Sequence, residues 1–209
     1  MINVVLASAS SGRLGTLTRA GVTPRVMVSD VDEDQVIADV QRDGRRLQAP
    51  EVARVLARAK CLSVLETLPP SDPADVVLGC DSVLEFGGEV HGKPHTAKVA
   101  RARWQAMRGS SGVLHSGHHM VRRAHDGAAH ASGVASTTVH FADVSDVEID
   151  AYVATGEPLS VAGGFTVDGL GGPYITGIEG DYHAVVGVSL PMVRDLLRQV
   201  GLQWHDLRP

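Results

Sequence analysis

The sequence predicts a single α/β domain over residues 1–209. The chain has 209 residues and an ordinary apolar content, which suffices for one full-sized domain with a buried core. Its amino-terminal stretch reads as a strand, a polar loop and a helix. Farther along, short β-rich runs alternate with stretches of helical periodicity, and no repeat or low-complexity segment interrupts them.

Charge and composition argue against several classes of protein. A net charge of -5, without a long run of Lys or Arg, argues against a nucleic-acid-binding surface. No apolar run approaches the roughly 20 residues that cross a bilayer, and the amino terminus lacks the pattern of a secretory signal. Cys61 and Cys80 show no CxxC spacing and are expected to be reduced packing residues. We expect a cytoplasmic protein that binds neither membrane nor nucleic acid, although a small anionic substrate is allowed.

The first predicted unit is a strand over residues 3–7, a loop over residues 8–12 and a helix over residues 13–20. Such a loop can present amide protons, serine hydroxyls and the positive end of a helix to a phosphate. Arg13 adds a bidentate donor. A serine-rich turn with nothing bound is the alternative, so this signal alone is weak.

A second strand is predicted over residues 25–29, and four carboxylates follow it within five residues. These are Asp30, Asp32, Glu33 and Asp34. They form either a solvated loop or a divalent-cation site, because hard cations take several oxygen ligands and usually recruit the phosphates of a substrate as well. A helix is predicted over residues 50–68, and Lys60 lies at the edge of its apolar stripe, where lysine most often extends to water.

Residues 76–94 place a carboxylate within an apolar strand. The β-rich runs 76–78 and 83–86 are interrupted by Asp81 and Ser82, before a Gly-Gly turn and a short return strand. A carboxylate in such a position must be solvated, paired or bound to a cation, and Lys93 is a candidate partner. The alternative is that Asp81 merely ends one strand at a turn.

A further helix is predicted over residues 96–107, followed by a long hairpin whose strands cover residues 113–123 and 131–141. Its turn signal is the Asp-Gly pair at residues 126–127. Three histidines lie on the first hairpin strand, namely His115, His118 and His119. We expect them to be exposed rather than metal-bound, since only two of the three can face the same side of a strand.

The last third begins with a capping box formed by Ser145 and Glu148, which predicts a helix that ends at Gly156. Five glycines in residues 162–172 indicate a backbone that bends closely around a ligand or a neighbouring strand. A strand over residues 174–178 and a helix that begins near Leu190 and ends near Val200 complete the prediction.

Several segments occur in an order and spacing that are together highly specific. They are LASAS followed by Arg13, Asp32-Glu33, LARAK at residues 56–60, GCDS at 79–82, GKP at 92–94, the strand at 138–141, YVATGEP at 152–158, Ala162-Gly163 and GDY at 180–182. With them, nearly the whole chain resembles the Maf family, the septum formation inhibitor family of nucleoside triphosphate pyrophosphatases. The resemblance implies an elongated mixed sheet flanked by helices, as in inosine triphosphatase-like folds.

The resemblance also implies a cleft that holds a nucleoside triphosphate and a divalent metal ion, Mg²⁺ or Mn²⁺. Hydrolysis between the α and β phosphates would give a monophosphate and pyrophosphate. Carried over by position, Ser8, Ser10 and Arg13 hold phosphate, Glu33 and Asp81 manage metal and water, and Lys60 and Lys93 neutralise the polyphosphate. Phosphoryl substitution needs such charge neutralisation and a positioned water. Asp81 is the candidate general base, with metal ligation as its competing role.

Ser82, Ser110 and Asp168 complete the expected substrate-binding residues. Many family members have a basic residue where this chain has Ser110, and glutamine where it has Asp168. Both positions fall in stretches expected to border the base, so the preference for a pyrimidine or a modified purine cannot be inherited. Asp168 could accept hydrogen bonds from a base or serve as a turn residue.

The resulting hypothesis is an enzyme that removes unwanted, including non-standard, nucleotides, and the resemblance is compatible with a homodimer. One alternative is a nucleotidyltransferase, because residues 6–15 resemble the strand-to-loop start with which such enzymes bind a triphosphate, but the chain after Phe141 resembles no acceptor-binding region. Another is a non-catalytic nucleotide sensor in cell division. The sequence contains no degraded catalytic position that would favour the sensor.

Overall fold

The fold is an α/β domain built on one mixed sheet. The structure, a computed structural model, describes residues 2–42, 44, 46–124 and 127–207. In these residues the strands are β1 (Val4–Ala7), β2 (Arg25–Val26), β3 (Val76–Phe86), β4 (Glu89–His91), β5 (Ser111–Arg122), β6 (Ala129–Phe141) and β7 (Ile175–Glu179). The helices are α1 (Ser11–Arg19), α2 (Glu33–Val40), α3 (Ala49–Thr67), α4 (Ala97–Met107), α5 (Asp146–Ala154), α6 (Tyr182–Val186) and α7 (Leu190–Gln199).

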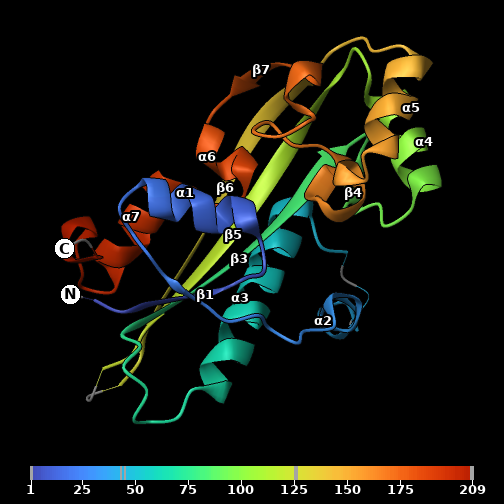
Figure 1. The fold of residues 1–209 in the computed structure, drawn as a ribbon. Coiled ribbons are helices and arrows are strands. Elements are labelled where there is room, and N and C mark those ends of the chain that lie inside the picture. The colour runs from blue at the N-terminus through green and yellow to red at the C-terminus, as the bar shows by residue number, and fades with distance from the viewer. Residues whose placement is uncertain (1, 43, 45, 125–126, 208–209) are drawn as a thin grey trace.

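The described residues form a seven-stranded sheet in the order β2-β1-β3-β5-β6-β7, with β4 paired to β3. Strand β1 is parallel to β2 and β3, and the remaining pairs are antiparallel. Strands β3, β5 and β6 run the length of the molecule, with α1 and α7 toward one end and α4 and α5 at the other (Figure 1). This arrangement confirms the predicted α/β fold with an elongated mixed sheet flanked by helices.

The two faces of the central strands bury different cores because side chains alternate along a strand. On one face, Leu6 and Leu78 pack against Leu196 and Leu197 of α7. On the other face, alternate residues of the same strands contact α3, including its Cys61. Both cysteines are free and buried, as predicted, and burial raises the pKa of each thiol to about 12.

Helix α3 lies unusually close to the sheet because two glycines face it. A Cβ at Gly79 would lie 2.3 Å from the Ala57 carbonyl oxygen, and a Cβ at Gly117 would lie 2.2 Å from the Ala53 carbonyl oxygen. Real Cβ atoms do not approach backbone this closely, so only glycine permits the contact. This packing brings the side chain of Lys60 to the sheet surface.

A separate core lies at the far end of the sheet, where α4 and α5 pack against β6. The Trp104 ring makes edge contacts with Phe141, Tyr152 and Tyr174 at centroid distances of 5.7, 5.5 and 5.8 Å. Its indole nitrogen donates to the carbonyl oxygen of Gly164 at 2.8 Å. Trp104 therefore anchors the beginning of the glycine-rich segment to this core.

Two local predictions are corrected. The strand expected over residues 25–29 contains only Arg25–Val26, and the acidic run after it begins helix α2. The Asp32 carboxylate caps this helix by accepting from the Gln35 amide at 3.0 Å. Carboxylates are favoured in the first turn of a helix, which explains why an acidic cluster opens one here. Asp81 and Ser82 also do not interrupt a strand, because β3 is continuous through both.

The three hairpin histidines are buried, which contradicts the predicted exposure. Strand β5 pairs with β3 and β6 along its two edges, and helices α3, α6 and α7 pack against it. His115 and His119 bond to Ser136 and Ser132 across the β5–β6 pair at 2.8 and 2.5 Å, and His118 accepts from the backbone amide of Ser189 at 2.9 Å. No set of three or more metal-ligating side chains is grouped in the described residues.

Most other elements match their predictions within a few residues. The long hairpin is present, although residues 125–126 of its predicted turn lie outside the described residues. The capping box of Ser145 and Glu148 opens α5, as predicted. In the described part of the chain, no helix combines the length and apolar character needed to cross a membrane.

The close approach of α3 predicts the effect of Gly117→Ala. The added methyl group would overlap the backbone of α3, so we expect the free energy of unfolding to fall by about 1–3 kcal/mol, measured by urea denaturation. Gly92→Ala is the matched control, since a Cβ there meets nothing within 4 Å, and its effect should stay within about 0.5 kcal/mol. Equal stability of the two variants would show that α3 can move away at no cost.

Candidate functional site

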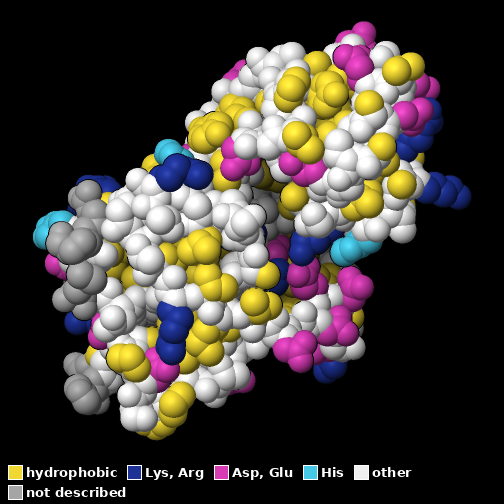
Figure 2. Space-filling view, viewed as in Figure 1, with side chains coloured by type: hydrophobic (Ala, Val, Ile, Leu, Met, Phe, Trp, Pro, Cys, Tyr) yellow, Lys and Arg dark blue, Asp and Glu magenta, His cyan; other side chains and the backbone are white. Residues whose placement is uncertain are grey.

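A cavity of about 720 Å³ opens between the two ends of the molecule. The surface is hollowed between two masses, and acidic and basic side chains gather beside the hollow (Figure 2). The cavity is lined by the loop before α1, by charged residues of α2, α3 and β3, and by the glycine-rich segment after α5. Of the predicted site residues, nine line it: Ser8, Ser10, Arg13, Glu33, Lys60, Asp81, Ser82, Lys93 and Asp168.

Ser110, the tenth predicted site residue, does not line this cavity. It lies in the turn between α4 and β5, where its amide donates to the Met107 carbonyl oxygen at 3.0 Å. Its own carbonyl oxygen accepts from the Phe141 amide at 2.9 Å. These backbone bonds give Ser110 a role in the turn.

The loop before α1 is held by its own serines. The Ser8 hydroxyl oxygen accepts from the Ser10 amide at 3.2 Å, and the Ser10 hydroxyl oxygen accepts from the Arg13 amide at 3.3 Å. Ser10 is thus the cap of α1, a helix of nine residues. The loop and the amino end of α1 face the cavity with a partial positive charge.

The Arg13 side chain is buried and bonds mainly to the protein itself. Its Nε donates to the Gly187 carbonyl oxygen at 2.9 Å, and its Nη1 donates to the Ser8 hydroxyl at 2.9 Å and to the Cys80 carbonyl oxygen at 2.7 Å. Its Nη2 donates to the Ser82 hydroxyl at 3.3 Å. These bonds engage four of the five guanidinium N–H groups. Arg13 therefore ties α1 to β3 and to the segment before α7, and one of its N–H groups, which bonds to none of the described residues, remains for a ligand.

Lys60 joins two carboxylates in the cavity. Its Nζ forms an ion pair with Glu33 at 2.7 Å and a short hydrogen bond with Asp81. Lys93 was a candidate partner for Asp81, and the structure pairs Asp81 with Lys60 instead. The Asp81 and Lys60 side chains are only 8% and 12% exposed, so this contact lies largely out of water, whereas Glu33 is 45% exposed.

The two carboxylates differ in how their environment affects them. Burial raises the pKa of Asp81, an effect that the positive charges of Lys60 and Arg13 oppose. Burial also acts to raise the pKa of Glu33, but the hydrogen bond from Lys60 and the charges of Lys60 and Lys93 outweigh it, and the pKa is lowered. Lys93, exposed at the cavity rim, thus contributes to the same electrostatic cluster.

Asp81 and Glu33 are the residues that could hold a divalent metal. Their oxygen atoms are hard donors of the kind that Mg²⁺ and Mn²⁺ prefer, and both carboxylates reach a common position at the Lys60 ammonium group. In the described residues they are not joined by a third metal-ligating side chain. The donor set therefore fits a metal whose remaining ligands come from water and from phosphate oxygens.

The remaining walls contain residues that the sequence-based prediction missed. Apolar side chains of Leu114, Phe165 and Val185 line one part, and Glu157 lines another. The glycine-rich composition of residues 162–172 indicated a close approach, and the structure shows more than one: Gly169 lies against Glu157, and Gly163 lies against Leu84 of the neighbouring strand β3. No local pattern marks the three apolar residues, because they come from separate elements that meet only in the folded chain.

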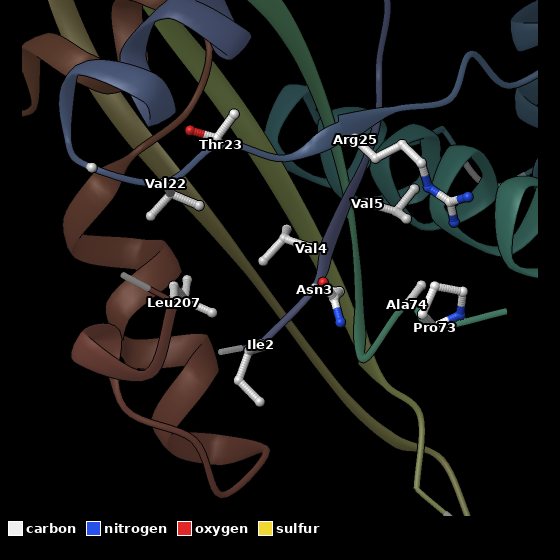
Figure 3. A pocket seen from close by; sticks show the side chains of 11 residues that line it. Ile2, Asn3, Val4, Val5, Val22, Thr23, Arg25, Pro73, Ala74 and Leu207 are labelled. Carbon is white, nitrogen blue, oxygen red and sulfur yellow. The ribbon is translucent and has the colours of Figure 1, made fainter. Parts of the chain in front are cut away.

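A second cavity, of about 300 Å³, lies beside β1 near the amino terminus (Figure 3). Its lining is largely apolar, with side chains of Ile2, Val4 and Leu207 among those drawn in Figure 3. Among the described residues of its lining only Arg25 is charged, and it pairs with Asp72 at 2.6 Å. It has no cluster of charged groups, so the larger cavity is the candidate functional site.

Comparison with known proteins shows which family this chain is similar to. The family model described as Maf-like protein matches residues 3–200. A protein of Salinispora tropica named nucleoside triphosphate pyrophosphatase is 53% identical over 207 residues, covering 96% of this chain and 85% of its own. Proteins with the same name from Mycobacterium ulcerans and Mycolicibacterium vanbaalenii are 50% and 48% identical, covering 97% and 99% of this chain and 94% and 99% of their own.

The matched region includes every residue that lines the larger cavity and almost all of the described fold. At about half of all positions the residues are identical to those of relatives of nearly the same length. The chain therefore belongs to the Maf-like protein family.

Proposed function

We propose that the protein is a metal-dependent nucleoside triphosphate pyrophosphatase that hydrolyses the bond between the α and β phosphates. The proposal rests mainly on the cluster of Lys60, Asp81 and Glu33 inside a cavity of about 720 Å³. The cavity lies within the range of about 300–1,000 Å³ that is common for small-molecule sites. The names of the relatives support the same reaction.

In this proposal the polyphosphate occupies the charged part of the cavity. The amino end of α1 supplies partial positive charge, and Lys60 and Lys93 supply full charges. Arg13 acts mainly by holding Ser8, Ser82 and the backbone in place, with one N–H left for a phosphate oxygen. Lys60 can exchange its carboxylate partners for phosphate oxygens, which would free the carboxylates as a polyphosphate enters.

The nucleoside would lie against the apolar part of the cavity, where Leu114, Phe165 and Val185 offer surface for a base. Asp168 and the backbone near Gly169 supply polar groups on the same wall. A carboxylate accepts hydrogen bonds only, so Asp168 favours bases that present an amino or imide N–H.

Asp81 would orient the attacking water and accept its proton, with Glu33 as the second carboxylate of the site. A raised pKa suits this role, because a stronger base takes the proton more readily. A divalent cation held by Asp81 and Glu33 would neutralise charge that develops on the phosphate oxygens.

We infer a role in removing unwanted nucleotides. A sensor that binds without turnover is less well supported, because the four candidate catalytic residues, Glu33, Lys60, Asp81 and Lys93, all line one cavity. A nucleotidyltransferase needs room for an acceptor, and none of the described residues that line the cavity identifies an acceptor site.

The direct test is to incubate the purified protein with Mg²⁺ or Mn²⁺ and a panel of ordinary and modified nucleoside triphosphates. We expect equal amounts of monophosphate and pyrophosphate, resolved by chromatography, without any added acceptor. Nucleotide binding with no product would favour the sensor. Products that appear only after an acceptor is added would favour the transferase.

Asp81→Asn should retain nucleotide binding, because the amide keeps the size of the side chain and its contact with Lys60. Turnover should fall by roughly 10²–10⁴-fold, the usual contribution of a general base. Release of pyrophosphate measures turnover, and calorimetric titration with a triphosphate measures binding. Near-normal turnover of this variant would show that Asp81 is not the general base of the reaction.

Chelation with EDTA should abolish turnover, and added Mg²⁺ or Mn²⁺ should restore it. The melting temperature should change little, because Lys60 pairs with both carboxylates and keeps Asp81 compensated within the fold. Activity and thermal unfolding would be followed on the same samples. Turnover that persists in EDTA would contradict the metal requirement.

A further inference from the structure

Glu157 is the most heavily hydrogen-bonded carboxylate that lines the cavity. It opens the short 3₁₀ helix Glu157–Ser160 that follows α5. Its Oε1 accepts from the Tyr152 hydroxyl at 2.9 Å, from the Thr166 hydroxyl at 2.6 Å and from the Gly171 amide at 3.0 Å. Its Oε2 accepts from the Leu170 amide at 3.0 Å. One side chain thus joins the end of α5 to both ends of the segment 166–171.

The segment 166–171 wraps closely around this carboxylate. A Cβ at Gly169 would lie 2.5 Å from the Glu157 Oε2, and a Cβ at Gly171 would lie 2.6 Å from the Tyr152 hydroxyl oxygen. A side chain at either position would push the backbone away from Glu157. The two glycines therefore serve the contact with the carboxylate.

The Glu157 carboxylate is stabilised as an anion by hydrogen bonds. Partial burial acts to raise its pKa, but the bonds from Thr166, the Leu170 amide, Tyr152 and the Gly171 amide outweigh burial and lower the pKa. Four donors converge on it, and an amide in its place would turn one acceptor into a donor that faces other donors. Hydrogen bonds to a charged group are stronger than those between neutral groups, so the ionised side chain is a strong anchor.

The preceding part of the glycine-rich segment has anchors of its own. The Gly164 carbonyl oxygen accepts from the Trp104 indole, and the Gly163 amide donates to the Gly92 carbonyl oxygen at 3.2 Å. Loss of the Glu157 carboxylate would therefore loosen residues 166–171 and leave residues 162–164 in place. Thr166, Asp168 and Gly169 line the cavity, so the loosened part is the wall beside the candidate nucleoside position.

We propose that Glu157 is a positioning residue that holds the wall formed by residues 166–171 against the nucleoside, and that it leaves binding of the polyphosphate unaffected. The proposal rests on the proposed function for the identity of the ligand. The groups that would bind polyphosphate come from α1 and the loop before it, from α2, α3 and β3, and from Lys93 after β4, and in the described residues none of them bonds to Glu157. Substitution of Glu157 should therefore weaken binding of the nucleoside end of the substrate and not of its polyphosphate end.

The test compares Glu157→Gln with Glu148→Gln. Glu148 is a suitable control because its carboxylate likewise accepts hydrogen bonds, from the Ser145 amide at 2.7 Å and the Ser145 hydroxyl at 2.8 Å, but it lies outside the cavity lining. For Glu157→Gln we expect KM for a nucleoside triphosphate to rise about tenfold, which corresponds to the loss of one charged hydrogen bond. We expect kcat to fall less, and the inhibition constant of pyrophosphate, which probes the phosphate end alone, to stay within about twofold.

Amide hydrogen exchange supplies a readout that needs no substrate. The amides of Leu170 and Gly171 should exchange about tenfold faster in Glu157→Gln, and as in the wild type in Glu148→Gln. Thr166→Val, which removes one donor, should give a smaller change in the same direction. Equal losses of triphosphate and pyrophosphate affinity, or unchanged exchange at both amides, would overturn the proposal. If the wild type hydrolyses no nucleoside triphosphate, the proposed function fails, whereas the exchange comparison still decides whether Glu157 holds the wall.

Discussion

The buried carboxylate of Asp81 is the constraint around which this structure is arranged. A charge inside a continuous central strand is costly unless it is paired, and Lys60 of α3 provides that pairing. Lys60 reaches it because Gly79 and Gly117 let α3 lie against the sheet. The same lysine contacts Glu33, which brings the start of α2 to the cavity. One ion-pair cluster thus links β3 to helices α2 and α3.

The second constraint is the division of the molecule into cores at opposite ends of a long sheet. Aliphatic residues around α7 form one core, and aromatic residues around Trp104 form the other. The cavity lies between them and receives charged residues mainly from one end and the glycine-rich wall from the other. Arg13 and Glu157 have similar structural roles, because each forms several hydrogen bonds to backbone groups of the segments that line the cavity.

Sequence-based prediction succeeded where the determining interactions are local. The capping box of Ser145 and Glu148 operates within one helical turn, and it correctly located the start of α5. It failed where neighbours distant in sequence decide the outcome. The histidines of β5 resemble exposed hairpin residues until both faces of that strand are covered, and the acidic run before α2 resembles a loop until Asp32 caps a helix.

The sequence by itself determined the α/β class, the positions of most helices and strands, and nine residues that line the site, since periodicity, caps and family motifs are written in consecutive residues. Only the tertiary structure decided which of these residues touch. Asp81 pairs with Lys60 rather than Lys93, Arg13 bonds to Gly187 across 174 positions, and Ser110 lies outside the cavity. These contacts depend on how helices pack on a sheet, and packing distances have no local signal in the sequence.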